Sequence, residues 1–336
     1  MTKLYGIQYL RALAAIAVVI FHAAERTGGH FAIGAAGVDI FFVISGFIMW
    51  VIAENRPISP GRFLLDRLKR IAPIYWIATL VMVGGAMAGL FPNLKLTLGH
   101  IFGSLFFIPH RSPSSGELWP VLVQGWTLNY EMFFYAVFAA VLFLPSRLRF
   151  GALALVFIGL VICGAIFDPE QSVLAAFTRP IMLEFLAGAA LGKLWIAGMM
   201  PSARTGLLLV AASFAGFAFI GLTYMGWNPY IFCLLATALV LGVLALEKAG
   251  AVPKAEPLAY LGDASYSIYI WHTMVISVVA KIGSAIALPG WSIIVLSTIG
   301  GTIGGLVAYE MLEKPLTRLL KKKPSAHREG LVKAPA

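Results

Sequence analysis

The chain is a series of long apolar runs separated by short polar breaks. Each run has about 18 or more residues, enough for an α-helix to cross a hydrocarbon core of about 30 Å. One apolar stretch, 98–109, is too short to cross and predicts a re-entrant or interfacial helix. The pattern predicts about ten transmembrane helices, at residues 7–24, 37–53, 71–90, 126–144, 150–167, 180–197, 206–223, 230–247, 264–282 and 291–312.

The composition favours a membrane protein over a large soluble helical core. Of the 336 residues, 60% are hydrophobic and 12% are charged. Soluble domains carry about 25% charged residues, so this chain has too little polar sequence to coat one. Cys163 and Cys233 lie inside apolar runs without metal-ligand spacing, which is typical of small hydrophobic side chains. We therefore expect an all-α, polytopic integral membrane protein with no metal site and no permanently bound cofactor.

The basic residues are unevenly distributed along the chain. The formal net charge is +10, but the cations cluster between and after apolar runs, which indicates membrane topology rather than nucleic-acid binding. With the N-terminus inside, 20 of the 25 Lys and Arg residues fall on the inner side. This bias predicts that both termini are cytoplasmic. We expect residues 1–315 to form the membrane domain and residues 316–336 a basic cytoplasmic tail.

Ionisable residues inside the apolar runs are candidates for function, because a charge at the centre of a span costs at least about 2.5–3.5 kcal/mol. Arg11 and His22 lie eleven residues apart on the first predicted helix. Three helical turns contain about 10.8 residues, so both side chains project from one face, about 16 Å apart along the axis. A lone buried His is often only a packing hydrogen bond, but a second ionisable group on the same face favours a functional role.

Two carboxylates lie near the outer ends of the second and fourth predicted helices. Asp39 is at the depth of His22, where it could hydrogen-bond the imidazole and raise the basicity of the other ring nitrogen. Alternatively, Asp39 only complements the helix dipole. Glu131 follows Trp126 by about one helical turn, and Trp126 itself suits a membrane interface.

A dense basic segment, residues 62–73, forms an inner loop that enters the third predicted helix and contains Arg67 and Arg70. Cytoplasmic clusters of this kind set topology and bind lipid headgroups. They also suit a phosphorylated donor, because Arg offers forked hydrogen-bond donors. The spacing leaves both interpretations open.

The ninth predicted helix carries His272 near mid-membrane, with Tyr266 and Tyr269 on a neighbouring face. Taken alone, a buried His in this position is more often structural than catalytic. Glu184 in the sixth predicted helix is either part of a packing ion pair or a site residue.

These segments together resemble the acyltransferase 3 family of membrane-bound carbohydrate O-acyltransferases, and within it the branch that acetylates bacterial exopolysaccharides. Each motif is weak by itself, but the ordered set covers nearly the whole chain. The matching stretches are Arg11-x10-His22, Gly37-Val38-Asp39-x-Phe41-Phe42-x-x-Ser45-Gly46, Arg67-x-x-Arg70 with Pro73-x-Tyr75-Trp76, Trp126-Thr127-Leu128-x-x-Glu131, Ser265-Tyr266-Ser267-Ile268-Tyr269-x-x-His272 and Glu313-Lys314-Pro315.

The resemblance implies a multi-pass protein of the bacterial cytoplasmic (inner) membrane. It would take an acyl group, acetyl by default, from acyl-coenzyme A as the donor substrate. The acceptor would be a hydroxyl of a polysaccharide or of its lipid-linked oligosaccharide precursor, with membrane lipid and polysaccharide assembly proteins as further partners. His22 would be the essential histidine with Arg11 as its partner, and Arg67 and Arg70 would belong to the motif associated with the donor.

A sugar hydroxyl is a poor nucleophile at neutral pH, so attack on a thioester needs a base such as histidine. We expect catalytic roles for His22, Asp39 and Glu131, with His22 removing the proton and either carboxylate orienting the ring. An acyl-histidine intermediate is a second mechanism that fits the same residues. Donor or substrate binding is expected of the remaining candidates, Arg11, Arg67, Arg70, Ser45, Trp126, Tyr269 and His272.

Two interpretations from other classes compete with an acyltransferase. A secondary transporter or glycan exporter also uses buried Arg, His and Asp residues, although inverted repeats with broken helices are not evident here. The other is a non-catalytic subunit of a polysaccharide assembly complex, which would tolerate substitution of Arg11 and His22.

Overall fold

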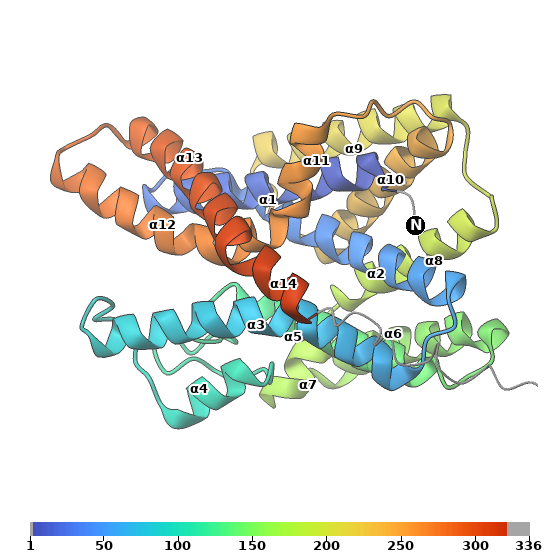
Figure 1. The fold of residues 1–336 in the computed structure, drawn as a ribbon, viewed down its shortest axis with the longest axis horizontal. Coiled ribbons are helices and arrows are strands. Elements are labelled where there is room, and N and C mark those ends of the chain that lie inside the picture. Colours follow the sequence, from blue (N-terminus) through green and yellow to red (C-terminus); the bar gives the residue numbers. More distant parts are fainter. Residues whose placement is uncertain (1–2, 321–336) are drawn as a thin grey trace, which may run out of the picture.

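The computed structural model describes residues 3–320, and within them every regular element is helical. The order of the elements is drawn in Figure 1. The bounds are α1 Tyr5–Arg26, η1 Ala32–Ala36, α2 Gly37–Asn55, α3 Pro60–Met87, α4 Leu98–Leu105, α5 Gly125–Val141, α6 Ser146–Phe167, α7 Ser172–Phe177, α8 Met182–Ile196, α9 Ala203–Thr223, α10 Pro229–Lys248, α11 Glu256–Asp263, α12 Ser265–Ala285, α13 Gly290–Ala308, η2 Tyr309–Glu313 and α14 Lys314–Leu320.

The all-α, multi-pass architecture expected from the apolar runs is confirmed. In the described part of the chain, eight helical segments are long and apolar enough to cross a membrane. The other two expected spans are also helices, but α5 has 17 residues and α8 has 15. The short apolar stretch near 98–109 forms the eight-residue helix α4, whose first turn is capped by the Thr97 hydroxyl accepting from the backbone N–H of His100.

The third helix begins eleven residues earlier than expected, which corrects the assignment of residues 62–73 to a loop. It starts at Pro60 and runs for 28 residues, so the basic segment forms its first turns. Proline suits this first position because its fixed φ is helical and its missing N–H would have no partner there. Arg and Lys are good helix formers, and hydropathy alone therefore placed the start of this helix too late. As a result, Arg67 and Arg70 belong to one continuous helix and lie about one turn apart on it.

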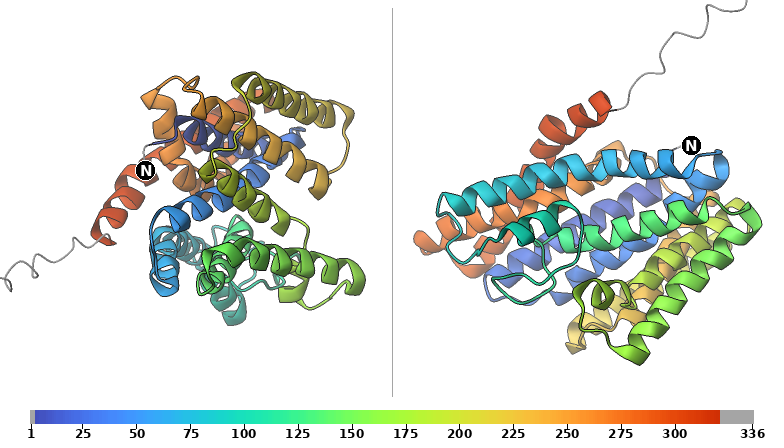
Figure 2. Two further views of the ribbon diagram at one scale, coloured as in Figure 1. Left: turned by 90° about the vertical axis from the view of Figure 1, so that its right-hand side faces the viewer. Right: turned by 90° about the horizontal axis from the view of Figure 1, so that it is seen from below.

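Two groups of helices lie on either side of α2. One contains α3 to α7, and the other contains α1 and α9 to α13 (Figures 1 and 2). On one side Phe42 and Trp50 of α2 join the buried core formed with α3, α5, α6 and α8. On the other side Val43 and Phe47 join the core formed with α1, α9 and α10. Helix α2 therefore contributes buried residues to both cores.

Helices α2 and α8 cross in direct backbone contact. A Cβ atom at Gly46 would lie 2.1 Å from the carbonyl oxygen of Phe185, and one at Gly188 would lie 2.0 Å from that of Val43. Small residues permit such close approach between membrane helices, where packing replaces the hydrophobic effect as the main driving force. The crossing fixes where the polar residues of α2 lie relative to α8.

Candidate active site

A cavity of about 630 Å³ lies between α1, α2, α3, α5, α12 and α14. Its lining extends from Arg62, in the first turn of α3, to Thr127, in the first turn of α5. We call the end of the bundle where α3 begins the basic end, and the opposite end, where α1 ends, the His22 end. Of the residues that the sequence singled out, six line this main cavity, namely Arg11, Ser45, Arg67, Arg70, Glu131 and Tyr269.

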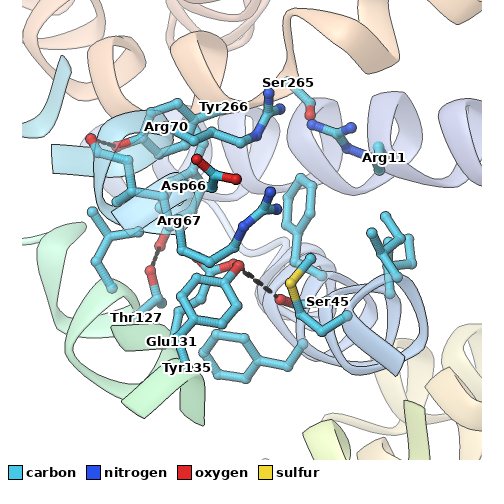
Figure 3. Close-up of a pocket in the computed structure, with 18 of the residues that line it drawn as sticks. Arg11, Ser45, Asp66, Arg67, Arg70, Thr127, Glu131, Tyr135, Ser265 and Tyr266 are labelled. Atoms are coloured by element: carbon cyan, nitrogen blue, oxygen red, sulfur yellow. Dashed lines mark hydrogen bonds between the residues drawn. The ribbon is translucent and has the colours of Figure 1, made fainter. Parts of the chain in front are cut away.

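The main cavity is rich in unneutralised positive charge. Its lining contains five cations against three carboxylates. Arg62 pairs with Asp66 one turn further along α3, at 3.0 Å. Within residues 3–320, no ion pair joins a carboxylate to Arg11, Arg67 or Arg70. Figure 3 shows the guanidinium groups of these three residues gathered around the same space. A cleft lined in this way attracts anions, and guanidinium groups suit phosphate oxygens in particular.

Beside this positive charge, Ser45, Glu131 and Tyr135 form a compact hydrogen-bonded cluster. The hydroxyl groups of Ser45 and Tyr135 both donate to Oε1 of Glu131, at 3.0 and 2.5 Å. The two hydroxyl oxygens are 3.1 Å apart. Helix α2 supplies Ser45, whereas the other two residues are one turn apart on α5. The cluster fixes the Glu131 carboxylate at the wall of the main cavity.

Tyr135 was not singled out in the sequence, although its spacing could have revealed it. It follows Glu131 by four residues, the separation at which side chains on a helix meet. Tyr266 was noted only for its spacing, yet it lines the main cavity and its hydroxyl donates to the backbone oxygen of Ile71, 2.7 Å away. That contact joins α12 to α3, and no local sequence pattern reports a contact between helices so far apart along the chain.

His22 lies outside the lining of the main cavity and has a different carboxylate partner from the one expected. Its Nδ1 is 3.1 Å from Oε2 of Glu25, which lies one turn further along α1. On its other side, the ring centroid of His22 is 5.2 Å from that of His272. A carboxylate at Nδ1 orients an imidazole in the manner foreseen for Asp39, but Glu25 is the residue in that position.

Asp39 faces α8 rather than His22. Its side chain is only 2% exposed, and its carboxyl group lies beside that of Glu184. The close crossing of α2 and α8 brings the two together, because both residues belong to the first turns of their helices. The expected common depth of Asp39 and His22 is wrong: a Cβ atom at Gly37, just before Asp39, would lie 2.4 Å from the carbonyl oxygen of Ala14, more than two turns before His22. No hydrogen bond joins Asp39 to His22 among residues 3–320.

An aromatic path leads from the main cavity toward His22. Tyr269, at the cavity wall, shares a hydrogen bond of 3.0 Å with the Thr127 hydroxyl. Its ring centroid is 5.9 Å from that of His272, which is fully buried and in turn neighbours His22. Nδ1 of His272 is 3.1 Å from the backbone oxygen of Ile268. Tyr269 and His272 therefore lie between the cationic cavity and His22.

Trp126 does not line the main cavity. It lies on the far side of α5, in the wall of a second, smaller cavity of about 140 Å³. Its ring packs edge-on against that of Tyr130, with centroids 5.8 Å apart. The expected donor-binding role of Trp126 therefore has no support from its position.

The comparison with protein families identifies the class of this protein. A family model described as an acyltransferase domain matches residues 4–310. The protein is therefore a membrane-bound acyltransferase. More particularly, the chain belongs to the acyltransferase 3 family, as its ordered motifs predicted.

Two relatives illustrate the range of this family. The exopolysaccharide production protein ExoZ of Rhizobium meliloti is 54% identical over 300 residues, covering 89% of this chain and 95% of that protein. The peptidoglycan O-acetyltransferase OatA of Listeria monocytogenes is 28% identical over 318 residues, covering 82% of this chain but only 50% of its own length. No solved structure matches the chain.

Proposed function

We propose that this protein transfers an acyl group, acetyl by default, from acyl-coenzyme A to a hydroxyl of an exported polysaccharide or of its lipid-linked precursor. The observation that carries the proposal is the main cavity, in which Arg11, Arg67 and Arg70 have no carboxylate partner among the described residues. Coenzyme A is an anionic donor with several phosphate oxygens, which guanidinium groups recognise well. Similarity to ExoZ and OatA supports a surface glycan as the acceptor.

The proposal places the basic end of the bundle in the cytoplasm, together with both termini. The positive-inside rule supports this orientation, because 20 of the 25 Lys and Arg residues fall on the inner side of the predicted topology when the N-terminus is inside. The donor then enters the main cavity from the cytoplasm of a bacterium, across its inner membrane. His22 lies at the opposite end, where an exported glycan would arrive.

The chemistry requires one base and a path for the acyl group. The sugar oxygen attacks the thioester carbon, the carbon–sulfur bond breaks, and coenzyme A leaves as a thiol after taking up a proton. His22 takes the proton of the sugar hydroxyl, with Glu25 holding its Nδ1. The acyl end of the donor reaches His22 by way of Tyr269 and His272, and Glu131 with Ser45 and Tyr135 lines the approach.

The test uses the full chain in lipid nanodiscs with radiolabelled acetyl-coenzyme A and oligosaccharides from alkali-deacetylated host exopolysaccharide. We expect His22→Ala to abolish label transfer while the protein remains folded and inserted. Arg67→Ala should raise the KM for the donor about tenfold or more, because a hydrogen bond to a charged group contributes about 1.5–3 kcal/mol.

The matched control is Arg147→Ala, which removes an exposed cation at the start of α6, outside the lining of either cavity. It should leave the donor KM unchanged. Near-normal transfer by His22→Ala, or equal effects of Arg67→Ala and Arg147→Ala, would contradict the assignment. Glycan movement across liposomes without acyl turnover would instead identify a transporter.

A further inference from the structure

We propose that the second cavity, on the far side of α5 from the main one, binds a sugar ring of the acceptor glycan other than the ring that is acylated at His22. This inference rests on the proposed function and adds to it the place where the acceptor sits. The cavity has a volume of about 140 Å³. Its wall contains two indole rings, a buried amide, a phenol and two charged groups of opposite sign, from Trp119, Trp126, Asn129, Tyr130, Glu117 and Arg179.

Helix α5 is a wall that the two cavities share. In its first two turns, Thr127, Leu128 and Glu131 line the main cavity. The interleaved residues Trp126, Asn129 and Tyr130 line the second cavity. A helix of 3.6 residues per turn places these two sets on opposite faces. One element thus presents the proposed donor site on one face and the second cavity on the other.

The chemistry of the second cavity suits a carbohydrate. Asn129 is only 3% exposed, and its Oδ1 has no hydrogen-bond partner among the described residues. A buried amide oxygen without a partner calls for a donor, which a sugar hydroxyl supplies. Trp119 is 41% exposed at the rim, and an indole ring there offers a flat apolar face to the C–H face of a sugar.

The charge of the second cavity also fits a sugar ring better than a phospholipid headgroup. The cavity has less than a quarter of the volume of the main one, so only a short segment of a ligand can enter. Glu117 and Arg179 both belong to its wall, so the site is not purely cationic. A phosphate group would meet the Glu117 carboxylate there, whereas a polyhydroxylated ring can use both charged groups as hydrogen-bond partners.

The wall that carries Trp119 is held in place by hydrogen bonds to α4. Nε2 of His100 is 3.2 Å from the backbone oxygen of Trp119. The Ser104 hydroxyl accepts from the backbone N–H of Val121 at 2.9 Å and donates to the backbone oxygen of His100 at 2.7 Å. These contacts fix the loop before any ligand binds, and a preformed site loses less conformational freedom on binding.

The decisive experiment separates binding of the acceptor from binding of the donor. Trp119→Ala removes the exposed ring, and Asn129→Leu removes the buried amide at nearly constant volume. The same nanodisc assay, with deacetylated host oligosaccharides as acceptor, measures KM for each substrate. We expect each variant to raise the acceptor KM about tenfold while the donor KM stays within about twofold of wild type. Trp291→Ala, an exposed Trp at the start of α13, is the control and should change neither.

The outcomes distinguish this inference from the proposed function. If wild type transfers label but both variants keep the wild-type acceptor KM, the second cavity is not the acceptor site. A dependence of those variants on anionic lipid in the nanodisc, with acceptor KM unchanged, would identify a headgroup site and also overturn the inference. If wild type transfers no label to any oligosaccharide, the proposed function itself fails.

Discussion

Removal of the Tyr135 hydroxyl is a selective probe of the cluster in the main cavity. In Tyr135→Phe, Glu131 loses its hydrogen bond of 2.5 Å, and the Ser45 hydroxyl loses a neighbour at 3.1 Å. The bond from Ser45 to Glu131, at 3.0 Å, remains. The phenyl ring can keep its edge-on packing against Phe63, with centroids 6.1 Å apart. The change therefore alters how Glu131 is held and leaves the core almost intact.

The magnitude follows from the kind of hydrogen bond that is lost. A hydrogen bond to a charged group contributes about 1.5–3 kcal/mol, and about 1.36 kcal/mol corresponds to tenfold in rate. If Glu131 must keep its present position for acyl transfer, kcat/KM for the donor should fall roughly tenfold to 150-fold. A loss in kcat alone would show that the position matters in the transition state, whereas a rise in KM alone would show that it matters for binding.

The control for this substitution is Tyr260→Phe. The Tyr260 hydroxyl donates to Oε1 of Glu310 at 2.8 Å, so the substitution removes a Tyr–Glu hydrogen bond of the same type outside both cavity linings. Acyl transfer should stay within about twofold of wild type in this control. The double variant Ser45→Ala with Tyr135→Phe should lose less than the sum of the single losses, because both residues act on one carboxylate. Wild-type kcat/KM in Tyr135→Phe would refute the reasoning.

Two further predictions concern stability. Gly188→Ala should lower the thermal midpoint, with a cost of about 1–3 kcal/mol, because its Cβ would lie 2.0 Å from a backbone oxygen of α2. Gly159→Ala on α6, with nothing within 4 Å, is the control, and equal midpoints would exclude a tight crossing. Burial lowers the pKa of His100, so the stability from its neutral ring is complete above about pH 6.5 and declines as the pH falls. Wild type should therefore lose more thermal stability than His100→Gln between about pH 7.5 and 5, and parallel losses would contradict this cause.

Hydropathy predicted the helices because the backbone N–H and C=O groups of each apolar run must form hydrogen bonds inside the bilayer, and an α-helix provides them within the run. The first span was expected at 7–24, and α1 is Tyr5–Arg26. The start of α3 was misplaced because polar residues continue the same helix beyond the apolar run. The short helices α7 and α11 were not expected, since neither is long enough to produce a separate apolar run.

For the site, the sequence could predict which helix carries each residue but not its neighbours on other helices. Counting residues along the predicted helices placed Asp39 and His22 at one level, but the start of α2 packs against Ala14 of α1, and the helix that each residue faces depends on how all the helices pack. Asp39 meets Glu184 because Gly46 and Gly188 let α2 and α8 touch, and these are contacts between distant parts of the chain. His22 meets Glu25 because the two are three residues apart, a spacing that the sequence did contain.

The contact between α2 and α8 also bears on the proposed chemistry, because adjacent residues of α2 contact different helices. Ser45 holds Glu131 across the main cavity at 3.0 Å, whereas the next residue, Gly46, lies against the backbone of Phe185. A side-chain hydrogen bond is lost beyond about 3.5 Å, so a shift of α2 by less than one carbon atom's width would leave Tyr135 as the partner that still holds Glu131. The position of the Glu131 carboxylate at the main cavity is thus set partly by the backbone packing of α2 against α8, outside the lining of that cavity.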